Sequence, residues 1–193
     1  MGVAGPDGAS RAPISPRRII GIDPGTMITG WGVVEAVGSS LNHIAHGTIA
    51  TAGAPAQADR LSLIYRGIEE VIQLYTPDGI SLERVFFARN AQSALKLGQA
   101  RGVALLAAAH HGLTVNEYGA AEIKMAVVGY GQASKVQVQK MVASLLRVAE
   151  QMAADAADAL AAAICHLHRQ SFQSRIVEAL RAECAGAPRR NRR

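Results

Sequence analysis

"RIIGIDPGTMITGWGVVE" spans Arg18–Glu35 and contains the pattern that decides the fold. An apolar run ends at Asp23, and the Pro-Gly that follows is the chemistry of a tight turn. Further β-branched and aromatic residues come after the turn, so the stretch predicts two strands joined by it. Asp23 is therefore either the polar residue of a turn or a carboxylate held at a strand end for use.

The rest of the chain predicts an α/β domain. We expect an antiparallel meander of strands over 18–23, 30–37 and 42–51, followed by alternating helices and strands. The later strands are expected over 80–87 and 113–118, and the helices over 56–75, 91–112, 120–128, 134–149 and 153–169. This order favours a mixed five-stranded sheet flanked by α-helices, with parallel crossovers for the later strands.

Length and composition predict one folded domain between two terminal segments. The 193 residues are 49% hydrophobic, which is enough for a substantial core over 17–170. Residues 1–16 are rich in glycine and proline and predict a disordered leader, and 171–193 predict a helical extension with a basic tail. The longest apolar runs fall short of the roughly 20 residues that cross a bilayer. We therefore expect a cytoplasmic protein without a membrane segment.

Positive charge is concentrated in parts of the chain. The formal net charge is +5, and both terminal segments are basic. Two further stretches between glutamates contain only positive fixed charges, namely Arg84, Arg89, Lys96 and Arg101, and then Lys124, Lys135, Lys140 and Arg147. These stretches could bind a polyanion, or they could be solvated helix faces.

Four acids fall on elements that could converge. Asp23 ends the first strand, Glu83 lies within the fourth, and the two strands can be neighbours in such a sheet. Asp155 and Asp158 share one face of an alanine-rich helix. Taken singly, Asp23 could be a turn residue and Glu83 a strand-edge charge. The helix pair could lie on an exposed face, or Asp155 could be a helix-start charge stabilised by the dipole. Together they could hold two divalent cations roughly 4 Å apart, which suits attack of water on a phosphodiester.

Several longer stretches resemble the RuvC family of bacterial Holliday-junction resolvases. They are "IIGIDPGTMITGWGVVE", "ERVFFARNAQSALKLGQARGVALLAA", "VVGYGQASKVQVQKMV" and "DAADALAAAICH", within about 18–170. The resemblance implies an RNase H-like fold and a homodimer that nicks two strands of a four-way DNA junction symmetrically with Mg²⁺ or Mn²⁺. It further implies a role in recombination and repair beside the branch-migration proteins RuvA and RuvB.

The resemblance also assigns residues. The catalytic and metal-binding quartet falls on Asp23, Glu83, Asp155 and Asp158. Phe86 matches an aromatic residue associated with bases at the crossover, although a core position is the alternative. Lys124 and Lys135 match DNA-binding lysines, with plain surface solvation as the alternative. Arg89, in the first acid-free stretch, completes the expected DNA-binding set.

Two other functions remain open at this stage. Actin-like and sugar-kinase-like ATPases also begin with an aspartate and a glycine turn, but they need a second lobe for which this chain has little room. A noncatalytic junction-binding protein would not need the acidic quartet.

Overall fold

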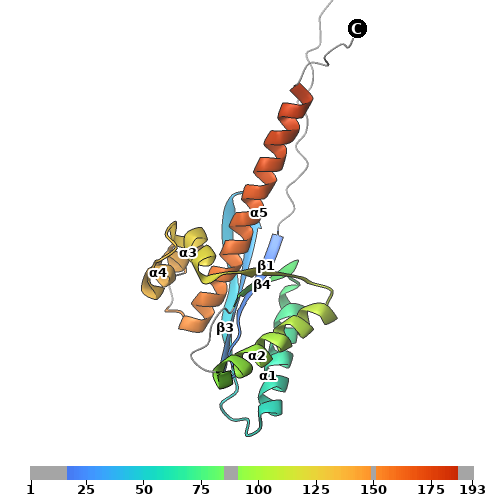
Figure 1. Ribbon diagram of the computed structural model, residues 1–193, viewed down its shortest axis with the longest axis vertical. Helices are drawn as coiled ribbons and strands as arrows, with labels where there is room; N and C mark the ends of the chain where they lie inside the picture. Colours follow the sequence, from blue (N-terminus) through green and yellow to red (C-terminus); the bar gives the residue numbers. More distant parts are fainter. Residues whose placement is uncertain (1–16, 85–90, 149–150, 187–193) are drawn as a thin grey trace, which may run out of the picture.

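The computed structural model describes residues 17–84, 91–148 and 151–186. A five-stranded sheet of order β3-β2-β1-β4-β5 lies at its centre (Figure 1). The strands are β1 (Arg17–Asp23), β2 (Ile28–Val37), β3 (Ser40–Ala50), β4 (Gly79–Glu83) and β5 (Thr114–Tyr118). The first three form an antiparallel meander, β4 pairs parallel to β1, and β5 pairs parallel to β4. The predicted mixed five-stranded sheet is confirmed.

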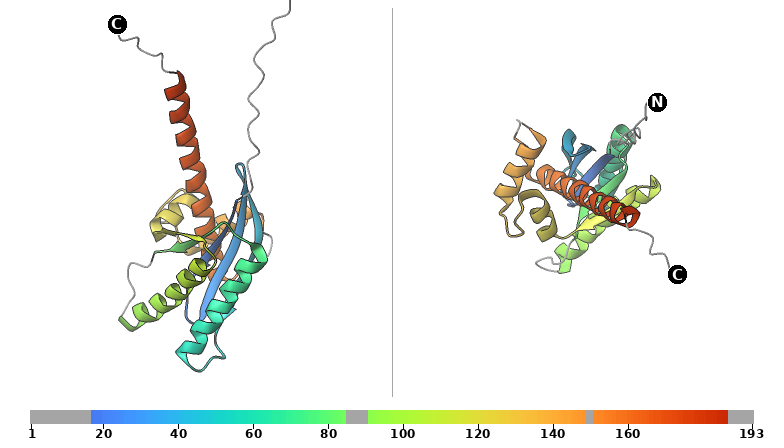
Figure 2. Two further views of the ribbon diagram at one scale, coloured as in Figure 1. Left: turned by 90° about the vertical axis from the view of Figure 1, so that its right-hand side faces the viewer. Right: turned by 90° about the horizontal axis from the view of Figure 1, so that it is seen from above.

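Helices cover both faces of this sheet, and each face has its own apolar core (Figure 2). One layer contains α1 (Gln57–Tyr75) and α2 (Ala91–His110). The other contains α3 (Ala120–Val128), α4 (Lys135–Leu146) and α5 (Ala154–Gly186). The second half of α5 projects beyond the sheet as an isolated helix (Figure 1). Among the described helices, none is long and apolar enough to span a membrane.

The alternation of side chains along β1 and β4 directs both strand-end acids toward α5. Ile20 and Ile22 belong to the core beside α1 and α2, whereas Ile19 belongs to the core beside α5. Because successive strand residues point to opposite faces, Asp23 lies on the α5 side. In β4, the Ser81 hydroxyl donates to the Ala162 carbonyl of α5 at 2.7 Å, so Glu83, two residues later, lies on that side as well.

Glycines let the main chain of α5 lie directly on the sheet. A Cβ atom on Gly21 would lie 1.8 Å from the Ala159 carbonyl oxygen, and one on Gly30 would lie 2.0 Å from the Asp155 carbonyl oxygen. No side chain fits at either position, and glycine inside a strand commonly marks such a close backbone approach. The glycines therefore allow the first turns of α5 to lie directly on β1, which ends with Asp23, and on its neighbour β2.

One predicted boundary is wrong, and two expected helical segments form a single helix. The strand expected over 80–87 ends at Glu83, which is therefore the last residue of β4 and not an interior one. Its pairing with β1 stops at Ile22 and Leu82, where Pro24 turns β1 away. The helix expected over 153–169 runs without a break into the expected helical extension and ends at Gly186, because this sequence contains many good helix formers and no proline.

Candidate active site

Asp23 and Glu83 lie at the same edge of the sheet. The parallel register pairs Ile22 with Leu82, and the two acids are the next residue of each strand. Parallel strands end at a common edge, which is where α/β proteins commonly bind ligands. The sequence expectation that these two acids approach one another is consistent with this register.

Asp155 and Asp158 reach the same edge from α5. Asp155 lies in the first turn of the helix, and its main chain contacts Gly30, the register partner of Asp23. Asp158 follows three residues later and therefore shares a helix face with Asp155. All four acidic side chains are only partly buried, which leaves the cluster open to solvent.

The charges of the four carboxylates influence one another. Burial raises the pKa of Asp23 to about 7, and the negative charges of Asp158, Glu83 and Asp155 add to the rise. Burial and the charge of Asp158 also raise the pKa of Glu83. Like charges held together disfavour ionisation unless a cation compensates them. The cluster therefore attracts positive charge.

Lys135 supplies part of that compensation. Its Nζ donates to Asp158 Oδ2 at 2.7 Å, and its charge lowers the pKa of both Asp23 and Glu83. Lys135 is the first residue of α4, after a capping box of Ser134 and Gln137. A cation is unfavourable at a helix N-terminus, and the negative charge of the acidic cluster offsets this unfavourable interaction of Lys135 with the helix dipole. Lys124, on α3, also lowers the pKa of Glu83 and lies within electrostatic reach of the site.

The donor set fits a hard divalent cation, because all four side chains offer carboxylate oxygens. As they stand, no three His, Cys, Asp or Glu side chains within the described ranges are arranged to chelate an ion. The Lys135 ammonium bonds one oxygen of Asp158 and competes for the same charge. Binding of a metal would therefore require small side-chain movements and displacement of this contact.

The structure describes two of the four predicted DNA-binding residues. Lys124 and Lys135 lie beside the acidic cluster. Phe86 and Arg89 lie outside the described residues. The first acid-free stretch is less available to a polyanion than predicted, because Arg84 pairs with Glu122 and Arg101 with Glu117. Both glutamates lie beyond that stretch in the sequence and reach back to it in the fold.

Sequence reasoning missed the residues that position the acids. Gly30 allows α5 to approach the sheet, and Ser134 caps the helix that begins with Lys135. Two signals were present: the paired glycines of "GWG" inside a strand pattern, and a serine followed by glutamine three residues later.

The sheet order, the two helix layers and the acids at one sheet edge define the class: an RNase H-like nuclease. A family model described as "Crossover junction endodeoxyribonuclease RuvC" matches residues 19–166. The chain belongs to the RuvC family. The enzyme of Syntrophotalea carbinolica with that description is 56% identical over 151 residues, which cover 78% of this chain and 94% of the relative. The Geobacter sulfurreducens enzyme is 52% identical, over 81% of this chain and 96% of its own length.

Solved structures agree with this assignment. Thermus thermophilus RuvC in complex with Holliday junction substrate superposes with a TM-score of 0.77 at 31% identity, over 82% of this chain and 97% of that one. The yeast mitochondrial Holliday junction resolvase shares the fold with a TM-score of 0.61 at 12% identity, over 86% of this chain and 83% of the resolvase. The family assignment excludes the ATPase alternative, because the family is one of nucleases.

Proposed function

We propose that this protein resolves four-way DNA junctions by paired, symmetric nicks, in recombination and repair. One observation supports this most strongly: two strand-end acids and two helix acids from distant parts of the chain interact electrostatically at one edge of the sheet. The related Thermus thermophilus enzyme was solved with a Holliday junction substrate. A cluster of carboxylates suits phosphodiester hydrolysis with metal ions and needs no serine or cysteine nucleophile.

We assign metal binding to Asp23, Glu83, Asp155 and Asp158. Two ions per site, Mg²⁺ or Mn²⁺, would supply an activated water and stabilise the leaving oxygen. Asp23 must lose its proton to become a ligand. Burial and the neighbouring negative charges, which raise its pKa to about 7, both oppose this loss. Burial and the charge of Asp158 raise the pKa of Glu83 as well, and the positive charge of Lys135 opposes that rise.

We assign DNA contacts to Lys124, Lys135, Phe86 and Arg89. Lys135 is mostly exposed, with 75% of its side chain accessible, so its ammonium can exchange Asp158 for a phosphate oxygen. Such a contact would position the backbone without reading bases. Phe86 and Arg89 lie outside the described residues, and their assignment rests on the sequence alone.

We further propose a homodimer formed through the outer face of α2. Ala100, Ala104, Ala107 and Ala108 face the core, so the buried alanines are not the contact surface. The outer face carries Leu95, Gly98, Gly102 and Leu106, which fall on one stripe of the helix. Leu95 is 70% exposed, and the space above both glycines is open. Two such stripes could pack closely about a two-fold axis and present two equivalent sites to a junction.

The cellular setting follows from the same proposal. A junction resolvase would act on DNA in the cytoplasm beside RuvA and RuvB. We expect these partners from the family's role.

A cleavage assay tests the proposal. Synthetic mobile four-way junctions, and linear duplexes of the same sequence, would be incubated with the protein and Mg²⁺ or Mn²⁺, and both labelled strands mapped. We expect paired nicks at symmetric positions in the junction and little cutting of the duplex. Binding without cutting would favour the noncatalytic alternative, and equal cutting of junction and duplex would contradict junction selectivity.

A further inference from the structure

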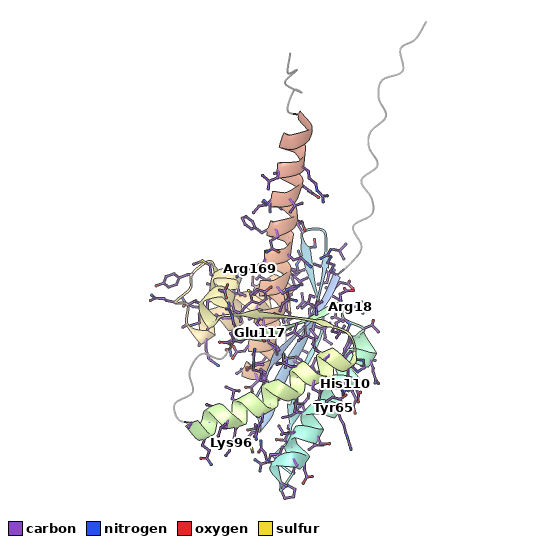
Figure 3. All side chains as sticks on the ribbon, turned by 45° about the vertical axis from the view of Figure 1, so that its right-hand side comes forward. Arg18, Tyr65, Lys96, His110, Glu117 and Arg169 are labelled. Atoms are coloured by element: carbon purple, nitrogen blue, oxygen red, sulfur yellow. The ribbon has the colours of Figure 1, made fainter. Side chains whose placement is uncertain are left out.

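Arg101 reaches the main chain of Glu83 from the opposite layer of the fold. It lies on α2, and its Nη1 donates to the Glu83 carbonyl oxygen at 3.0 Å. Its other terminal nitrogen, Nη2, pairs with the carboxylate of Glu117 on β5. Only 18% of the Arg101 side chain is exposed, so this guanidinium is committed to protein acceptors and is poorly placed to bind a DNA phosphate. Figure 3 labels Glu117 near the sheet and Lys96 toward the N-terminal end of α2.

The peptide group after Glu83 is held at both of its polar atoms. Arg101 binds its carbonyl oxygen, and its N–H, which belongs to Arg84, donates to the Tyr118 carbonyl at 2.7 Å. Glu83 is the last residue of β4, and strand pairing with β1 has already ended one residue earlier. These two hydrogen bonds therefore fix the backbone from which the Glu83 side chain points to α5.

We propose that Arg101 is a positioning residue for Glu83 in the cleavage reaction, and that it couples the placement of α2 to this carboxylate. The proposal rests on the function proposed above. Groups that orient a metal ligand typically matter roughly 10- to 100-fold in metal affinity or activity. If α2 is also the dimer contact, Arg101 links that contact to the reacting centre.

Lysine cannot replace arginine in this role. The guanidinium presents several N–H groups in a rigid plane and serves the Glu83 carbonyl and the Glu117 carboxylate at once, whereas an ammonium is a single point charge. Arg101→Lys keeps the charge and removes the double contact. It therefore separates positioning from general electrostatic attraction of DNA.

Arg18 offers a matched control. Its guanidinium also bonds one main-chain carbonyl, that of Tyr75 at 2.6 Å, and one glutamate, Glu35 at 2.8 Å. It lies near the start of β1, at the opposite end of the strand from Asp23 (Figure 3). Arg18→Lys removes the same kind of contact without touching the candidate site.

The experiment compares the parent protein with Arg101→Lys, Arg18→Lys and Glu117→Gln. Four quantities would be measured: the melting temperature, the dissociation constant for a four-way junction, the single-turnover cutting rate under saturating protein, and the Mg²⁺ concentration that gives half of the maximal rate. For Arg101→Lys we expect cutting to be roughly 10- to 100-fold slower with a raised Mg²⁺ requirement. Junction binding should stay within about 2-fold of the parent, because Arg101 does not contact DNA.

The other variants complete the test. Arg18→Lys should cut at the parent rate, and Glu117→Gln should fall between the parent and Arg101→Lys, because it removes only the ion pair. An Arg101→Lys protein that is folded and cuts at the parent rate with the parent Mg²⁺ requirement would overturn the positioning role alone. Lost junction binding in that variant would overturn it in favour of a DNA contact. A parent protein that cuts no junction would overturn the proposed function and the role of Arg101 with it.

Discussion

Asp23 is the last residue of β1 and a member of the acidic cluster. The connection to β2 begins with Pro24 directly after it, and the strand alternation points its side chain toward α5. The burial and like charges that raise its pKa to about 7 also make it a source of instability when it is ionised. Ligand sites often oppose stability in this way.

The first prediction concerns the pH dependence of that instability. Because the pKa of Asp23 is raised on folding from an ordinary value of 3.8, its contribution favours the folded state at low pH and is lost as the pH rises from about 4 through about 7. In EDTA at about pH 8, Asp23→Asn should therefore raise the melting temperature by at least ~2 °C, since about 1 kcal/mol corresponds to roughly 2–4 °C in a chain of this size.

Thermal melts at two pH values check this expectation. The difference between Asp23→Asn and the parent should shrink toward about pH 4, where the parent carboxyl is also protonated. A variant that is less stable than the parent in EDTA at about pH 8, or a difference that does not change with pH, would contradict it.

At the residue scale, the acids that could cluster were easier to recognise in the sequence than the pairing of the arginines. Asp23, Glu83, Asp155 and Asp158 stand out because each occupies a strand end or an apolar helix where a charge is unusual. The pairing of Arg84 with Glu122 and of Arg101 with Glu117 joins residues that lie well apart along the chain. Linear charge patterns do not contain such pairings, because the pairings depend on how α2 and α3 pack beside β4 and β5.

At the element scale, the approach of α5 to the sheet places the two helix acids. Gly30 makes this approach possible, and a methyl group there would collide with the Asp155 main chain. Strand and helix types were predictable from periodicity along most of the chain. The end of β4 was not, because it depends on where its partner strand turns away.

The second prediction tests this element contact. Gly30→Ala should destabilise the fold by about 1–3 kcal/mol or more, because the clash is with main chain that cannot rotate away. It should also slow junction cutting, since Asp155 and Asp158 move with α5. Chemical denaturation and the cutting assay measure the two effects.

Gly53→Ala is the matched control. Nothing lies within 4 Å of the position that its added Cβ would occupy. It should leave both stability and cutting close to those of the parent. Equal stability of Gly30→Ala and Gly53→Ala would contradict the close approach of α5.

At the scale of the whole molecule, the outer stripe of α2 is the surface that a homodimer would use. Glycine inside a helix is destabilising by about 1 kcal/mol relative to alanine, and α2 contains two of them on an open face. Close packing against another helix would explain both. The sequence could not assign the inner and outer faces of this helix, because alanines and leucines occur around much of it.

The third prediction concerns assembly. Gly102→Gln fills open space in the isolated chain, so the fold should survive, but the longer side chain should prevent two α2 helices from approaching closely. Light scattering should report a dimer for the parent and a monomer for Gly102→Gln. Lys96→Gln, on an exposed position of α2 that has no i,i+3 or i,i+4 relation to any member of the stripe, should remain dimeric. A dimeric Gly102→Gln would contradict the α2 interface.

The central claim is that the four acids form one metal-dependent cutting site and not a DNA-binding surface. Junction cutting and junction binding should therefore be measured side by side for Asp23→Asn, Glu83→Gln, Asp155→Asn and Asp158→Asn. The control is Glu35→Gln, on β2 opposite Arg18 and far along the strand from Asp23. We predict that each quartet variant cuts at least about 100-fold more slowly and binds the junction as tightly as the parent, since loss of a direct ligand should exceed the loss of an outer partner. Any quartet variant that cuts at the parent rate with Mg²⁺ or Mn²⁺ would contradict the account.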